Sequence, residues 1–152
     1  MDAIMSKPEA VVLVLVLVVE SLKALTLGTL TALKRGKIGK FINAEDANWL
    51  GGDVVSYDAP EPSRLFRAHR NALENLLPFS VLACSYILAG GNGLAGIIYF
   101  IVFSLSRIAH SYAYLACKPM MRRNAYSIGW LVQIILALHV TTVVILGYAT
   151  GI

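Results

Sequence analysis

Long apolar segments alternate with short polar connections along this chain of 152 residues. The apolar segments run from about 10 to 33, 71 to 90, 93 to 117 and 125 to 151, and helical spacing extends the second and fourth back to about 64 and 123. Each is close to the roughly 20 residues that an α-helix needs to cross a hydrocarbon core of about 30 Å. The pattern therefore predicts an all-α fold, an integral membrane four-helix bundle, in a single domain over residues 1–152.

The first apolar segment differs from a secretory signal in length and charge. It is longer than the roughly 7 to 15 apolar residues of such a signal, and it carries Glu20 and Lys23. We therefore expect a helix that the protein retains. The two charged residues lie three positions apart, which predicts that they pair with each other or with a neighbouring helix.

Composition supports the membrane interpretation. The chain has 57% hydrophobic and 14% charged residues, whereas a soluble domain usually has about a quarter charged residues. These values argue against an ordinary soluble enzyme, and the net charge of +4 is too scattered for a nucleic-acid-binding surface. Two cysteines and three histidines lack the spacing of metal ligands, so we expect no metal site.

The three connections between these segments differ in charge. The turn at residues 89–93 has no charged residue. The other two connections and their flanks carry the basic residues Lys34, Arg35, Lys37, Lys40, Arg64, Arg67, Arg70, Lys118, Arg122 and Arg123. Because cytosolic loops collect Lys and Arg, we expect both basic connections in the cytosol and the termini on the opposite side. The connection from about Gly36 to Glu61, rich in turn-forming and acidic residues, predicts a solvated cytosolic segment.

Polar residues recur at three- and four-residue steps in the second and third segments, and a further polar set opens the fourth. The sets are Arg64, Arg67, Arg70, Asn71 and Glu74; Arg107, His110, Ser111, Tyr114 and Lys118; and Arg123, Asn124, Tyr126 and Ser127. An arginine at the centre of a membrane span costs about 2.5 to 3.5 kcal/mol on insertion, so such side chains should face one another or a wet cavity. Two interpretations stay open: contacts that join helices, or a pocket for a small, mostly anionic ligand with one positive charge. Three sets at one membrane boundary favour the pocket.

Two histidines lie outside these sets. His69 points away from the polar stripe of its segment, and we expect it to contact solvent or the connecting loop. His139 lies alone in the apolar fourth segment, and we expect it to be a packing residue.

The polar runs resemble those of a known family. The segment from Arg67 to Phe79, RAHRNALENLLPF, resembles the signature of the MAPEG family, the membrane-associated proteins of eicosanoid and glutathione metabolism. The resemblance extends to Glu45-Asp46-Ala47, to the run from Arg107 to Leu115 and to Arg123, and so covers nearly the whole chain. Within the family it is most similar to the branch of the microsomal glutathione transferases and prostaglandin E synthases.

The resemblance implies a homotrimer that binds glutathione between subunits near the cytosolic side, with a lipophilic substrate arriving from the bilayer. The glutathione-binding positions that it implies are Arg35, Arg67, Arg70, Asn71, Glu74, His110, Tyr114 and Arg123. Arg123 matches an arginine that stabilises the thiolate, and Asp46 matches an acid that relays a proton. Asn124 stands where a serine takes part in thiol activation, which departs from the prostaglandin synthase pattern.

These residue types also suit glutathione chemically. Arginines can hold its carboxylates bidentately, and Glu74 is the one acid on the stripes that can pair with its ammonium. A guanidinium near the thiol favours the thiolate, which attacks electrophiles and peroxides. We expect a glutathione transferase or glutathione-dependent peroxidase. Two alternatives stay open: an isomerase of the prostaglandin endoperoxide, and a non-catalytic membrane protein that binds a partner through its basic face.

Overall fold

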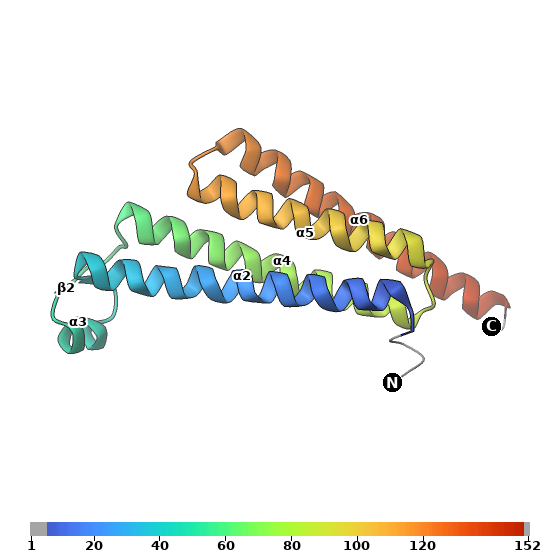
Figure 1. Ribbon diagram of the computed structural model, residues 1–152, viewed down its shortest axis with the longest axis horizontal. Coiled ribbons are helices and arrows are strands. Elements are labelled where there is room, and N and C mark those ends of the chain that lie inside the picture. Colours follow the sequence, from blue (N-terminus) through green and yellow to red (C-terminus); the bar gives the residue numbers. More distant parts are fainter. Residues whose placement is uncertain (1–5, 151–152) are drawn as a thin grey trace.

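The computed structural model describes residues 6–150, and four long helices make up most of it (Figure 1). The elements are α2 (Pro8–Ile38), β1 (Lys40–Phe41), α3 (Ala44–Leu50), β2 (Asp53–Val54), α4 (Pro60–Leu88), α5 (Gly93–Leu115) and α6 (Pro119–Thr150). Each long helix is long and apolar enough to cross a membrane. The predicted all-α membrane fold with four spanning helices is confirmed.

The helix ends explain where the observed bounds differ from the predicted ones. α2, α4 and α6 begin at Pro8, Pro60 and Pro119, two to four residues before the predicted starts, because proline fits the first helical turn without losing a hydrogen bond. α2 continues past residue 33 to Ile38 and ends at Gly39, whose φ of 67° is left-handed. With 31 residues it is about 46 Å long, so its last turns extend beyond a hydrocarbon core of about 30 Å.

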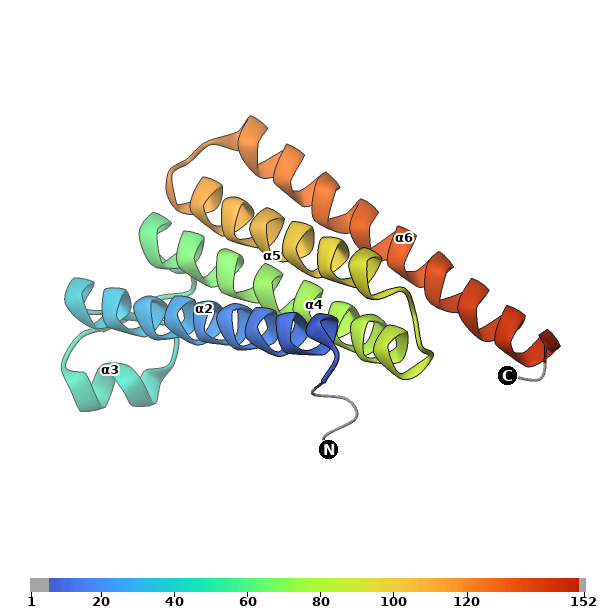
Figure 2. The same cartoon turned by 45° about the vertical axis from the view of Figure 1, so that its right-hand side comes forward.

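The four long helices run side by side in two pairs, α2 with α4 and α5 with α6 (Figures 1 and 2). One end of the bundle brings together the end of α2, the start of α4, the end of α5 and the start of α6. These are the segments that hold most of the basic residues. The final turns of α6 extend past the other helices at the opposite end.

Two apolar clusters form the interior of the bundle. The larger joins all four long helices and consists of Ala10, Leu13, Val16, Phe79, Ala83, Tyr86, Ile87, Phe100, Phe103, Val132 and Leu136. Within it the rings of Phe79 and Phe103 stack with centroids 3.7 Å apart. The smaller joins α2 to the first half of α4 and consists of Ala24, Leu27, Leu65, Ala68 and Ala72. Along α2 the two clusters are separated by Glu20 and Lys23, so a polar layer lies between them.

The connection between α2 and α4, predicted as a solvated segment, has regular structure of its own. β1 and β2 pair in parallel, with Lys40 opposite Asp53, and α3 links them. Phe41 of β1 is buried, and Gly52 leaves space for its ring, because a Cβ there would lie 2.8 Å from Phe41 Cε2. The segment therefore carries Asp46 of α3 at a defined place at the end of α2 (Figure 1).

Candidate functional site

A buried polar cluster occupies the layer between the two apolar clusters. Glu20 of α2 pairs with Lys23 one turn later, and its Oε1 accepts a hydrogen bond from Ser104 Oγ of α5 at 2.9 Å. Both parts of the predicted pairing, within α2 and with a neighbouring helix, are thus confirmed. Glu20 and Arg107 are each 2% exposed. The cluster therefore combines one carboxylate, Glu20, with two cations, Lys23 and Arg107.

Arg107 joins α5 to α6. Its Nη2 donates to the Ala125 carbonyl at 3.3 Å, and its guanidinium lies 5.5 Å from the centre of the Tyr126 ring. Its Nε and Nη1 have no hydrogen-bond partner within residues 6–150. Gly129 permits this approach, because a Cβ there would lie 3.0 Å from Arg107 Nε. The close packing of α6 on α5 at this level therefore depends on a glycine opposite a buried arginine.

His110 and Tyr114 continue the polar face of α5 towards the basic end. His110 is buried, with its ring centre 5.4 Å from that of Tyr114 and 6.1 Å from that of Tyr126. Arg122 at the start of α6 places its guanidinium 4.6 Å from the centre of the Tyr114 ring. Two predicted site residues, His110 and Tyr114, are thus brought together within one chain. Arg122 joins them as a neighbour that the sequence interpretation did not include in the site.

The predicted site residues of α4 lie on its outer side. Arg67, Arg70 and Glu74 are exposed, and Asn71 is half-buried. Arg70 Nε donates to Glu74 Oε1 at 2.7 Å, which forms a pair one turn apart. Arg67 also lines a small pocket with Tyr114, whereas Arg70 and Glu74 pair with each other on the exposed surface. Only part of the predicted pocket is therefore assembled within one chain.

Arg35 has a partner that the sequence analysis missed. Its Nε and Nη2 donate to the two carboxylate oxygens of Asp58, both at 2.7 Å, and the Asp58 side chain is only 8% exposed. Asp58 is one of five acids in its connection, and nothing in its spacing distinguishes it. A bidentate contact between residues 23 positions apart depends on how the connection folds back on α2.

We predict that Asp58→Ala loosens the connection between α2 and α4. The change removes both oxygens that hold the Arg35 guanidinium, and a half-buried charge then loses a bidentate partner. In limited proteolysis of detergent-solubilised protein, residues 39–59 of the variant should be cut several times faster than those of the unchanged protein. Glu45→Ala, which removes an exposed acid of the same connection, should be cut at the original rate. Equal rates for both variants would contradict this role of Asp58.

The three residues predicted to act on the thiol are spread over two elements. Arg123 is exposed and has no hydrogen bond or ion pair within residues 6–150, and Asn124 follows it on α6. Asp46 lies on α3, where its Oδ2 accepts a hydrogen bond from Asn43 Nδ2 at 3.1 Å. Both views place α3 and the start of α6 on opposite sides of the bundle. A single chain therefore does not bring Asp46 to Arg123.

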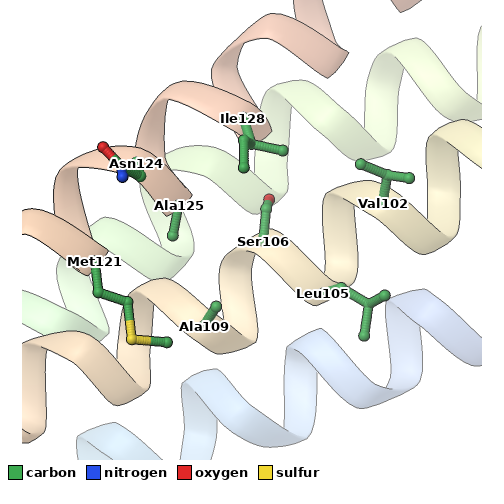
Figure 3. Close-up of a pocket in the computed structure, with 8 residues that line it drawn as sticks. All are labelled: Val102, Leu105, Ser106, Ala109, Met121, Asn124, Ala125 and Ile128. Atoms are coloured by element: carbon green, nitrogen blue, oxygen red, sulfur yellow. The ribbon is translucent and has the colours of Figure 1, made fainter.

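An apolar hollow of about 530 Å³ lies between α5 and α6 (Figure 3). It is lined by Val102, Leu105, Ser106, Ala109, Met121, Asn124, Ala125 and Ile128. Asn124 and Ser106 supply its two polar side chains, and the other six are apolar. The hollow therefore suits a lipophilic group, and one predicted site residue, Asn124, belongs to its lining.

The two histidines outside the polar stripes both pack within the bundle. Nδ1 of His69 lies 2.8 Å from the Ala24 carbonyl oxygen, and Gly28 makes room for its ring. His69 is half-buried and contacts the α2 backbone, a neighbour that the sequence did not indicate, because α2 and α4 approach closely over Ala24 and Gly28. His139 lies in α6 with its Nδ1 3.1 Å from the Tyr99 hydroxyl, as expected of a packing residue.

Comparison with known proteins identifies the family. The MAPEG family profile matches residues 10–142. The chain is 30% identical to a prostaglandin E synthase of Homo sapiens over 138 residues, which are 90% of this chain and 91% of that protein. It is 32% identical to microsomal glutathione S-transferase 1 of Rattus norvegicus over 120 residues, which are 76% of this chain and 77% of that protein. With its four apolar helices, the chain is an integral membrane protein that belongs to the MAPEG family.

Proposed function

We propose that this protein is an enzyme that binds glutathione and uses its thiolate to attack lipophilic electrophiles or to reduce lipid hydroperoxides. The observation that carries the proposal is the outer side of α4, where Arg67, Arg70 and Glu74 are exposed on a membrane-spanning helix. Charged side chains there are costly unless a ligand, water or another subunit covers them. The names of the relatives, a glutathione S-transferase and prostaglandin E synthases, support glutathione as that ligand.

The charges on α4 suit the γ-glutamyl end of glutathione. That end carries a carboxylate and an ammonium on one carbon. The Arg70–Glu74 pair presents a guanidinium and a carboxylate one helical turn apart. Each could exchange its present partner for the opposite charge of the ligand. We propose that Asn71 adds an amide contact and that His110 and Tyr114 bind from the side of α5.

We propose that the site is completed by other copies of the chain in a homotrimer. Arg70 and Glu74 are exposed on the surface of their own bundle, and Arg123 is exposed without a partner within residues 6–150. A second copy could bring its Arg123 and Arg35 to the α4 face of the first. Arg35 would then exchange Asp58 for a glutathione carboxylate.

The proposed chemistry begins with the thiolate. Arg123 would stabilise the thiolate, and Asn124 could donate a hydrogen bond to it. In conjugation, sulfur forms a bond to the electrophilic carbon as the leaving group departs. In peroxide reduction, two glutathiones and one hydroperoxide give glutathione disulfide, an alcohol and water. Asp46 would relay a proton only if the connection of a neighbouring copy reaches the site.

We propose that the lipophilic substrate enters from the bilayer through the hollow between α5 and α6. Six of the eight lining side chains are apolar, and Asn124 belongs to the lining. A hydrophobic substrate in this hollow (Figure 3) would contact Asn124, and Arg123 directly precedes Asn124 in the sequence. The basic end of the bundle would face the cytosol, because cytosolic loops collect Lys and Arg.

Particular residues distinguish the proposed function from two alternatives, an isomerase and a non-catalytic membrane protein. The named relatives include prostaglandin E synthases, and Asp46 is present, which favours an isomerase of the prostaglandin endoperoxide. Asn124, in the place of a serine, favours transferase and peroxidase chemistry instead. A non-catalytic membrane protein would not need the complete set of proposed glutathione contacts.

The test is a titration of purified protein with glutathione, followed by ultraviolet absorbance of the thiolate. Turnover is then measured with an aryl halide, a lipid hydroperoxide and a prostaglandin endoperoxide. Conjugation or peroxide reduction supports the proposal. Conversion of the endoperoxide alone would assign the isomerase instead. Absence of glutathione binding would contradict the proposal and favour a non-catalytic membrane protein that binds a partner.

We predict that Glu74→Gln weakens glutathione binding by about tenfold to 100-fold, because a charge-assisted hydrogen bond contributes about 1.5 to 3 kcal/mol. Isothermal titration with glutathione and with its analogue that lacks the amino group makes the test specific. The substitution should leave affinity for the analogue unchanged, since no ammonium is present. Equal losses for both ligands would contradict the assignment.

A further inference from the structure

A basic pocket lies where the start of α4, the end of α5 and the start of α6 meet. Its volume is about 260 Å³, and it is lined by Arg64, Arg67, Tyr114, Cys117, Pro119 and Arg122. We call it the arginine pocket. It contains three guanidinium groups, and none of its lining residues is an acid.

The three arginines are held by neutral groups. Arg67 Nη1 donates to Ser63 Oγ at 2.8 Å, Arg64 contacts Cys117 Sγ, and Arg122 lies over the Tyr114 ring. Within residues 6–150, none of them forms an ion pair. Glu61 lies near Arg64, and both line a neighbouring pocket, but it pairs with Lys34 instead. Three like charges thus converge without forming an ion pair among the described residues, an arrangement that suits an anionic ligand group.

Arg122 and Arg123 are consecutive but face different ways. Successive residues of a helix point about 100° apart. Arg122 is half-buried and lines the arginine pocket, whereas Arg123 is exposed and outside it. The thiolate role proposed above uses Arg123 and leaves Arg122 without a function.

We infer that Arg122 binds the glycyl carboxylate of glutathione in the arginine pocket, together with Arg64 and Arg67. The inference rests on the proposed function. The γ-glutamyl end of glutathione carries both charges and suits the Arg70–Glu74 pair, whereas the glycyl end carries only a carboxylate and suits a pocket without an acid.

The spacing along α4 fits the length of the ligand. Arg67 and Glu74 are seven residues apart, which corresponds to about 10 Å along the helix. An extended tripeptide spans about 10 Å. One glutathione could therefore contact the Arg70–Glu74 pair and the arginine pocket at once. The consecutive arginines of α6 would then have separate roles, because Arg122 would bind a carboxylate in the pocket of its own subunit and Arg123 would act on a thiolate.

The competing explanation is that Arg122 only stabilises the fold by stacking on Tyr114. Glutathione and its glycyl monoethyl ester separate the two explanations, because the ester lacks the carboxylate that Arg122 would bind. KM and kcat are measured with both thiols for the unchanged protein, Arg122→Ala and Arg122→Lys. Lys40→Ala is the control, since it removes an exposed positive charge from β1, outside the arginine pocket.

We expect Arg122→Ala to raise KM for glutathione by about tenfold to 100-fold, the loss of a charge-assisted hydrogen bond, with little change in kcat. KM for the ester should be the same in this variant as in the unchanged protein. Arg122→Lys should recover part of the affinity, because it keeps the charge without the bidentate geometry. Lys40→Ala should leave both KM values unchanged.

Three results would overturn the inference. Equal increases in KM for glutathione and the ester would assign Arg122 to the fold. An unchanged KM for glutathione, with loss of bound anionic phospholipid, would assign the pocket to a lipid headgroup. Absence of glutathione binding by the unchanged protein would overturn the proposed function itself, and the first titration detects it before any variant is compared.

Discussion

Arg123→Ala is expected to lower kcat with glutathione by about 100- to 1,000-fold, the loss typical when one donor to a developing or stable anion is removed. The physical reason is that the guanidinium cannot lose its proton near neutral pH and so stabilises the thiolate. A free thiol has a pKa of about 8.5. Without Arg123, the pKa of the bound thiol should rise towards that value, and the pH profile of kcat should shift to higher pH.

The side chain of Arg123 is exposed and makes no hydrogen bond or ion pair within residues 6–150, so its removal should not disturb the fold of a protomer. Thermal unfolding of the variant serves as the control for stability. Thiolate absorbance at neutral pH should fall while glutathione still binds at higher concentration. Full turnover at neutral pH with normal binding would remove the proposed role of Arg123.

Glu20→Leu is expected to destabilise the protein by about 3 to 5 kcal/mol, the usual result of removing one partner of a buried ion pair. Glu20 is the acid of the buried polar cluster and is 2% exposed. Lys23 and Arg107 would remain as cations between two apolar clusters, and Ser104 would lose its acceptor. Thermal unfolding in detergent should show a large decrease in the melting temperature.

A double variant tests whether the effect comes from charge. Glu20→Leu combined with Lys23→Leu removes the ion pair as a unit, although Arg107 then stays buried without the carboxylate. It should therefore be more stable than Glu20→Leu alone. If the double variant is less stable than Glu20→Leu alone, the unpaired charge of Lys23 is not the cause of the loss. Glu45→Leu, on the exposed surface of α3, should change little.

Much of the fold follows from local sequence patterns. Each apolar segment is long enough to cross the membrane, and the helix ends follow from Pro8, Pro60 and Pro119 and from the left-handed Gly39. The short strands and α3 were not predicted. Their pairing depends on Gly39 and Phe41 meeting residues more than ten positions later. Hydrophobic periodicity within a segment cannot predict contacts between residues so far apart in the sequence.

The candidate site was only partly accessible to sequence reasoning. Spacing placed Arg67, Arg70 and Glu74 on one face of a helix, because residues three and four apart share a face. It could not tell whether that face turns inward or outward. Spacing also gave no sign that Asp58 holds Arg35, or that Arg122 turns into a pocket while Arg123 does not.

The amino-acid sequence alone was therefore enough to predict a membrane environment, four helices and the polar residues that share a helix face. Hydropathy and helical periodicity are local properties of the chain. Only the tertiary structure decided how those faces are used. Helix packing buried Glu20, Arg107 and His110 inside the bundle and left Arg70 and Glu74 of α4 exposed. The physical reason is that the rotation of each helix about its axis is set by side-chain fit with its neighbours, as Gly129 against Arg107 shows.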